Sequence, residues 1–142
     1  MPHSFFDTNI LIYAARPNLE PRDEPKRPIA IALLDGEEFV TSGQVLAEFY
    51  HNTVRKGDSR LSHEEAELWL DRIADRPCAS VDAMLVSMGA SFSARYRISY
   101  WDGAMLAAAQ ELGATTFYSE DLHHGQRYGD VTVVNPFRSL SH

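Results

Sequence analysis

Short segments typical of strands alternate with longer segments typical of helices along most of this chain. The strand segments, rich in aromatic or β-branched residues, are residues 5–6, 38–41, 115–118 and 131–134. The helical segments are expected near residues 10–15, 26–34, 43–55, 62–76, 83–96 and 101–112. This alternation predicts βαβ units and a mostly parallel sheet. We expect an α/β three-layer sandwich with four to five short strands, formed by residues 1–142 as one domain.

The composition is globular but acidic. The formal net charge of −7 argues against broad electrostatic binding to nucleic acid or anionic membranes. A polyanionic substrate would therefore need a bound divalent metal or a local cluster of basic residues. Cys78, the one cysteine, suits a reducing compartment and is expected to be a buried structural residue. No apolar run approaches the roughly 20 residues that span a bilayer, and no secretory signal is visible, so we expect a cytoplasmic protein without membrane contact.

The start of the chain places an acid directly after a predicted strand. Phe5 and Phe6 are typical of the end of a buried strand, and Asp7 follows them. Thr8 and Asn9 then lead into an apolar run that is typical of a helix. The carboxyl end of a first strand is where open α/β sheets bind their ligands. The alternative is that Asp7 or Thr8 only caps the helix, since both residue types accept hydrogen bonds from free N–H groups.

Two further acids lie on predicted helices. Glu48 falls beside the apolar face of the helix near residues 43–55, for which Gly57 is the expected stop signal. A solvated glutamate is the alternative for this position. Asp102 opens the helix near residues 101–112 and shares the buried face with its apolar residues. A helix cap is the alternative for Asp102.

A fourth acid, Asp121, follows the predicted strand 115–118 in the same way that Asp7 follows the first strand. Because all parallel strands end at the same side of a sheet, both acids should lie at one edge. Helices that are entered from this edge bring Glu48 and Asp102 toward it. The sequence therefore predicts four carboxylates in one crevice.

Such a cluster of acids favours a bound cation. Carboxylates a few ångströms apart repel one another and raise one another's pKa. Oxygen ligands suit Mg²⁺ or Mn²⁺, which can activate a water molecule for attack on phosphate. Thr8, Asn9 and Ser119 add neutral oxygens and hydrogen-bond donors. No cysteine or histidine pattern supports zinc.

These motifs, in this order, resemble those of PIN-domain ribonucleases, and more narrowly those of toxins of the VapC type. The resemblance spans nearly the whole chain. Its four motifs are Phe6-Asp7-Thr8-Asn9, Val45-Leu46-Ala47-Glu48-Phe49, Tyr100-Trp101-Asp102-Gly103-Ala104-Met105 and Tyr118-Ser119-Glu120-Asp121-Leu122. Gly103 departs from the alanine of many relatives and costs helix propensity. Glu120 is a further acid beside Asp121, which leaves the identity of the fourth ligand open.

The resemblance implies a PIN-like sandwich and a Mg²⁺- or Mn²⁺-dependent endoribonuclease that hydrolyses RNA with a metal-activated water. It implies that Asp7, Glu48 and Asp102 bind the metal directly or through water, while Asp121 closes the site or holds a second ion. It also implies a toxin of a toxin–antitoxin pair that forms a homodimer and is inhibited by a cognate antitoxin.

Other functions fit parts of the pattern. A haloacid dehalogenase-like phosphohydrolase also opens with a strand and an aspartate, but its chemistry needs a second aspartate where this chain has Asn9. A non-catalytic nucleotide- or flavin-binding α/β domain would need a phosphate-binding loop after the first strand, and Asp7 would repel phosphate without a metal. A non-catalytic partner-binding domain is the third alternative.

Some residues suggest chemistry only weakly. His123 and His124 lie in a polar loop, so we expect surface residues or an RNA contact instead of metal ligands. A modest basic cluster, which either guides phosphates or only solvates the surface, consists of Arg16, Arg22, Lys26 and Arg27.

Overall fold

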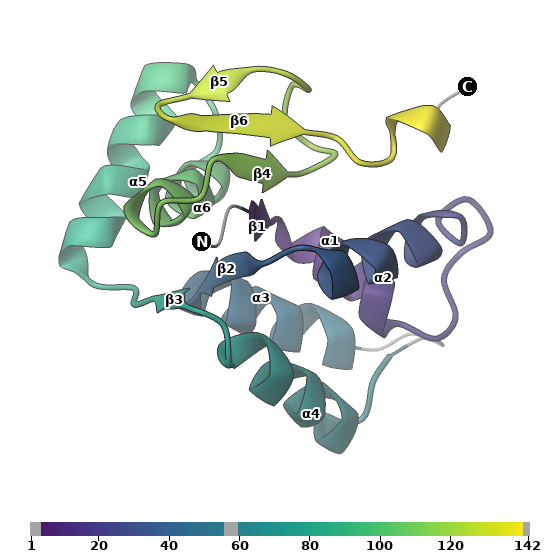
Figure 1. Ribbon diagram of the computed structural model, residues 1–142. Coiled ribbons are helices and arrows are strands. Elements are labelled where there is room, and N and C mark those ends of the chain that lie inside the picture. The colour runs from purple at the N-terminus through teal and green to yellow at the C-terminus, as the bar shows by residue number, and fades with distance from the viewer. Residues whose placement is uncertain (1–3, 56–59, 141–142) are drawn as a thin grey trace.

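The computed structural model describes residues 4–55 and 60–140. In this part of the chain six strands form one sheet in the order β3-β2-β1-β4-β6-β5, and helices lie on either side of it (Figure 1). Neighbouring strands are parallel except for β5 and β6, which are antiparallel. The expected α/β sandwich with a mostly parallel sheet is confirmed. The strands are β1 (Ser4–Phe6), β2 (Phe39–Ser42), β3 (Cys78–Ala79), β4 (Thr116–Tyr118), β5 (Arg127–Tyr128) and β6 (Val131–Val134).

The prediction of four to five strands is wrong, because it missed β3 and β5. Each of these strands has two residues and lies at an edge of the sheet, so neither shows an alternation that a sequence pattern could reveal. In β3 the first residue, Cys78, is exposed and the second, Ala79, is buried. Because successive residues of a strand point to opposite faces, Ala79 faces the core and Cys78 faces solvent. The prediction that Cys78 is buried is therefore also wrong.

The helices occupy the predicted segments to within a few residues. Ser42 caps α3 by accepting a hydrogen bond from the backbone N–H of Val45 at 3.3 Å, and Ser62 with Glu65 forms a capping box at the start of α4. Gly57, the expected stop signal, lies outside the described residues. The helices are α1 (Thr8–Ala15), α2 (Lys26–Gly36), α3 (Gly43–Val54), α4 (His63–Ala74), α5 (Ala83–Tyr96) and α6 (Tyr100–Glu111), followed by a 3-10 turn at Arg138–Leu140.

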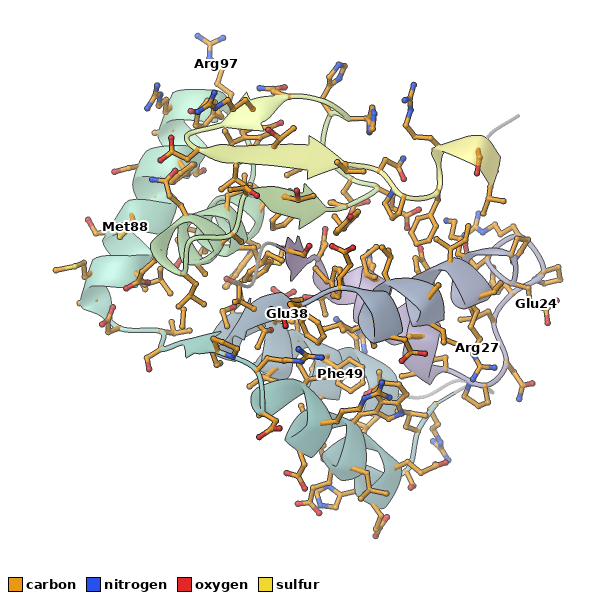
Figure 2. The ribbon with its side chains drawn as sticks, viewed as in Figure 1. Glu24, Arg27, Glu38, Phe49, Met88 and Arg97 are labelled. Carbon is orange, nitrogen blue, oxygen red and sulfur yellow. The ribbon has the colours of Figure 1, made fainter. Side chains whose placement is uncertain are left out.

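The helices enclose a buried core, and their surfaces face solvent. Figure 2 shows Phe49 of α3 among the helices, while Arg97 at the end of α5 projects away from the molecule. Phe49 is fully buried and packs on Trp69 of α4, with 6.3 Å between the ring centroids. Within the described residues, none of the helices combines the length and apolarity needed to cross a bilayer.

The central strand β1 determines where a site can form. Its aromatic residues are buried: Phe5 stacks on Phe117 of β4 with 5.5 Å between ring centroids, and Phe6 packs on Phe39 of β2 at 4.7 Å. The chain passes from β1 to β2 and β3 on one side, then returns to β4 on the other side of β1 (Figure 1). The direction of winding therefore switches at β1. In open α/β sheets the crevice beyond the carboxyl ends of the strands at such a point binds the ligand.

Helices α5 and α6 pack with their backbones in close contact. A Cβ atom added to Gly89 would lie 2.8 Å from Cα of Ala104, and one added to Gly103 would lie 2.6 Å from the carbonyl oxygen of Gly89. The expectation that Gly103 only costs helix propensity was therefore incomplete. Its missing side chain permits the close approach that positions the start of α6, where Asp102 lies.

Candidate active site

Asp7 is a buried carboxylate directly after β1, with 5% of its surface exposed. It is the N-cap residue of α1, but its side chain makes no capping hydrogen bond. Instead, Oδ2 of Asp7 accepts a hydrogen bond of 2.8 Å from Oγ of Ser119. Burial raises the pKa of Asp7 to about 7; the Ser119 bond opposes this change, whereas the charges of Asp121, Asp102 and Glu48 add to it. Asp7 thus lies within electrostatic reach of all three other acids.

Glu48 of α3 is held through both of its carboxylate oxygens. Thr8 donates a hydrogen bond of 2.7 Å from Oγ1 to Oε1 of Glu48, and Gln44 donates one of 2.9 Å from Nε2 to Oε2. Nε2 of Gln44 also donates to the carbonyl oxygen of Trp101 at 3.0 Å. Glu48 is therefore fixed to α1 and, through Gln44, to the start of α6, and it is not a freely solvated glutamate.

Asp102 lies in the first turn of α6 and is half-buried. The N-cap of this helix is Ser99, whose Oγ accepts a hydrogen bond of 3.1 Å from the backbone N–H of Asp102. The carboxylate of Asp102 is therefore not the cap. Burial raises the pKa of Asp102, and the charges of Asp121 and Glu48 raise it further, while Ser99 opposes the increase.

Ser119 links the ends of β1 and β4. This buried hydroxyl donates to Asp7 and accepts a hydrogen bond of 3.1 Å from the backbone N–H of Asp121. Asp121 is the most exposed of the four acids. Partial burial and the charge of Glu120 raise the pKa of Asp121, and the charge of Lys26 opposes this effect.

Glu120 differs from the other acids because a cation neutralises it. Lys26 of α2 forms a salt bridge of 2.8 Å with Oε2 of Glu120, and the hydroxyl of Tyr13 donates to Oε1. Lys26 also pairs with Asp23 at 3.1 Å. Burial of the ammonium group lowers the pKa of Lys26, but the hydrogen bonds to Glu120 and Asp23 together outweigh this effect. The pKa of Lys26 is therefore raised.

Two hollows border the acids. One, of about 580 Å³, lies at Asp121 and has Asn9, Arg22 and Lys26 in its wall. The other, of about 480 Å³, lies at Glu48 and is lined mainly by apolar and aromatic groups, among them Ala47, Val81, Tyr100 and Trp101. The hollow at Asp121 thus combines two cationic side chains with the carboxylates of Asp23, Glu120 and Asp121, whereas Glu48 is the one charged residue among the described residues that line the other hollow.

The basic cluster is largely occupied by contacts within the protein. Arg16 donates a hydrogen bond of 2.6 Å to the carbonyl oxygen of Asn52, Lys26 is bound as described, and Arg22 is exposed. His123 and His124 are both exposed, which confirms the prediction that they are surface residues.

Asp7 interacts electrostatically with Asp121, Asp102 and Glu48, so the four acids that the sequence had suggested lie near one another. Glu48 and Asp121 nevertheless line two different hollows, and the prediction of one shared crevice is not met in this form. The structure also reveals Gln44, which the sequence interpretation missed. Gln44 precedes Glu48 by four residues, the spacing at which helical side chains meet, so this spacing was the available signal.

The donor set suits a hard divalent cation, although the described residues form no complete cage. In the described residues, no Lys, Arg or His forms a salt bridge with any of the four acids. The same part of the chain contains no group of three His, Cys, Asp or Glu side chains arranged to hold a metal ion. Mg²⁺ usually takes one or two carboxylates and keeps several waters. Oxygen donors grouped at this edge therefore fit such an ion without a preformed cage.

Residues 4–129 match the family described as the PIN domain. The chain therefore belongs to the PIN-domain family. No curated protein matches the chain.

Solved structures with a similar fold include toxins of toxin–antitoxin systems. A Mycobacterium tuberculosis VapC toxin, described as cleaving the sarcin-ricin loop, is 19% identical, with 83% of this chain and 91% of that chain covered and a TM-score of 0.65. A toxin–antitoxin complex from Klebsiella pneumoniae is 16% identical, with coverages of 94% and 97% and a TM-score of 0.67. The FitAcB structure from Neisseria gonorrhoeae is 19% identical, with coverages of 95% and 99% and a TM-score of 0.60. At these identities the likeness shows the fold.

Proposed function

We propose that the protein is a Mg²⁺- or Mn²⁺-dependent endoribonuclease and the toxin of a toxin–antitoxin pair. One observation supports this proposal: Asp7, a buried carboxylate at the switch point, interacts electrostatically with Asp121, Asp102 and Glu48, and its pKa is raised to about 7. Burial is the main cause of this raised pKa, and repulsion by the other three acids adds to it; both effects destabilise the charged form, and groups perturbed in this way are typical of functional sites. Membership of the PIN-domain family supports the reaction class.

The proposed roles differ between the side chains of the site. Asp7, Glu48 and Asp102 would hold the ion directly or through water, and Asp121 would close the site or hold a second ion. A bound divalent ion would supply a nucleophilic water at neutral pH and neutralise charge on the phosphate. Ser119 acts as a positioning residue, because it fixes the orientation of Asp7.

The neighbouring polar groups support this arrangement. Thr8 orients Glu48 through a hydrogen bond of 2.7 Å. Asn9 lies in the wall of the hollow at Asp121, where its amide would contact RNA or ordered water. Glu120 holds Lys26 near the site and is proposed as a supporting residue, with Asp121 as the fourth acid.

The partners follow from the same proposal. The substrate is RNA, the protein acts as a homodimer, and a cognate antitoxin inhibits it. The similarity in fold to the toxin–antitoxin complex from Klebsiella pneumoniae supports the toxin role.

Cleavage of end-labelled RNA tests this function. We expect cleavage by the wild-type protein with Mg²⁺ or Mn²⁺ and none with EDTA. Asp102→Asn should reduce the rate by at least about 100-fold, because metal and acid–base chemistry contribute effects of this size. Asp71→Asn, on the exposed surface of α4, removes the same charge outside the site and should keep full activity. Equal cleavage by Asp102→Asn, or undiminished cleavage in EDTA, would contradict the proposal.

The same assay separates the alternatives. Hydrolysis of a small phosphomonoester without cleavage of RNA would favour a phosphohydrolase, which the PIN-domain match speaks against. RNA binding without hydrolysis of either substrate would favour a non-catalytic binding domain.

A further inference from the structure

We propose that the hollow at Glu48 binds one unpaired base of single-stranded RNA beside the cleaved phosphate, and that this base stacks on Trp101. This inference rests on the proposed ribonuclease function and names a recognition site for its substrate. The hollow has a volume of about 480 Å³, which is within the range of roughly 300–1,000 Å³ that is usual for ligand pockets.

The aromatic wall of the hollow is accessible. Trp101 is 61% exposed although it is a large apolar side chain. Tyr100 lies beside it, with 5.1 Å between the ring centroids and an angle of 77° between the rings. An exposed indole face next to a second ring provides a platform of the kind on which single-stranded RNA stacks its bases.

Hydrogen bonds fix this platform relative to the acids. Nε2 of Gln44 donates both to the carbonyl oxygen of Trp101 at 3.0 Å and to Oε2 of Glu48 at 2.9 Å. Trp101 also directly precedes Asp102 in the chain. A base on Trp101 would therefore belong to a nucleotide at or next to the scissile bond.

The charges favour a base over a phosphate in this hollow. Its lining contains the carboxylate of Glu48 and no Lys or Arg side chain, so a phosphate would be repelled while a neutral ring would not. The hollow at Asp121 contains Arg22 and Lys26 together with the carboxylates of Asp23, Glu120 and Asp121, so its described lining carries no net positive charge either.

This inference is tested by the binding of a fluorescein-labelled single-stranded RNA heptamer of mixed sequence. Ca²⁺ is the only divalent ion present, so that binding is measured without relying on cleavage. Trp101→Ala should weaken binding by about 5- to 150-fold, which corresponds to the ~1–3 kcal/mol contributed by stacking of one base. Trp101→Phe should bind within about threefold of the wild type, because it retains a ring face. Leu68→Ala removes a side chain that is 72% exposed on α4 and should change nothing.

A second measurement identifies the base itself. Heptamers with an abasic ribose at each position in turn should show one position at which the wild type loses affinity and Trp101→Ala does not. In a Trp69→Phe background, the same RNA should quench the fluorescence of Trp101.

The outcomes separate this inference from the proposed function. RNA binding that depends on Trp101, without any cleavage in Mg²⁺, would retain the base site and reject the nuclease. Cleavage with unchanged RNA affinity in Trp101→Ala would reject the base site and retain the nuclease. A change in oligomeric state in Trp101→Ala, with unchanged RNA affinity, would show that this face binds another protein chain and would also overturn the inference.

Discussion

The raised pKa of Asp7 predicts that removing its charge stabilises the metal-free protein. A tenfold change in a protonation equilibrium corresponds to about 1.36 kcal/mol. Raising the pKa of this buried side chain from 3.8 to about 7 therefore corresponds to about 4 kcal/mol of destabilisation once the pH exceeds 7. Asn has nearly the same shape and can still accept the Ser119 hydrogen bond, so Asp7→Asn should recover about 2–4 kcal/mol at pH 8.

The sign of the pH dependence follows from the direction of this pKa change. When the folded-state pKa is raised, the associated stability is complete below the unfolded value of 3.8 and is lost as the pH rises toward about 7. The difference between Asp7→Asn and the wild type should therefore be below about 1 kcal/mol at pH 4 and should grow up to pH 8.

Urea unfolding in EDTA, followed by far-UV circular dichroism between pH 4 and pH 8, measures this difference. Asp71→Asn is the control, because it removes a charge from the exposed face of α4, and its stability should follow the wild type. If Asp7→Asn were less stable than the wild type by more than about 1 kcal/mol at pH 8, the Asp7 carboxylate would be a structural hydrogen-bonding group and our reasoning would be refuted.

Three other substitutions test the supporting contacts by urea unfolding. Ser119→Ala removes the buried donor to Asp7 and should cost about 1–3 kcal/mol at pH 8; an unchanged stability would mean that this bond contributes nothing. Gly103→Ala gains about 1 kcal/mol of helix propensity, but its Cβ atom would lie 2.6 Å from a backbone oxygen of α5. We therefore expect the free energy of unfolding to fall by about 1–3 kcal/mol, and a more stable variant would contradict this close packing. Glu120→Gln removes the partner of Lys26, whose side chain is 20% exposed, and should cost about 1–2 kcal/mol; a more stable variant would refute the stabilising role of this salt bridge.

The sequence was sufficient to predict the acids at the strand ends. Asp7 and Asp121 each follow a strand of the parallel core, and the rule that parallel strands end at one edge was enough to bring them together. Glu48 and Asp102 needed the helical periodicity as well. These positions depend on topology and not on side-chain detail, whereas the role of each acid in a site stays a prediction.

The sequence could not show how each acid is neutralised or held. Lys26 and Glu120 are 94 residues apart, and no local pattern links them. The sequence also showed only that Gly103 lowers helix propensity. It could not show that a Cβ atom at this position would meet the carbonyl oxygen of Gly89 on another helix. Short edge strands such as β3 form only because a neighbouring strand is already in place, and two residues carry no periodic signal.

Binding of Mn²⁺ measured by isothermal titration calorimetry tests the central claim most directly, because it asks whether the converging acids hold a cation. The account predicts that the wild type and Asp71→Asn bind Mn²⁺ with the same affinity, and that Asp7→Asn and Asp102→Asn bind it at least about tenfold more weakly. Absence of Mn²⁺ binding in the wild type, or equal binding by Asp102→Asn, would contradict it.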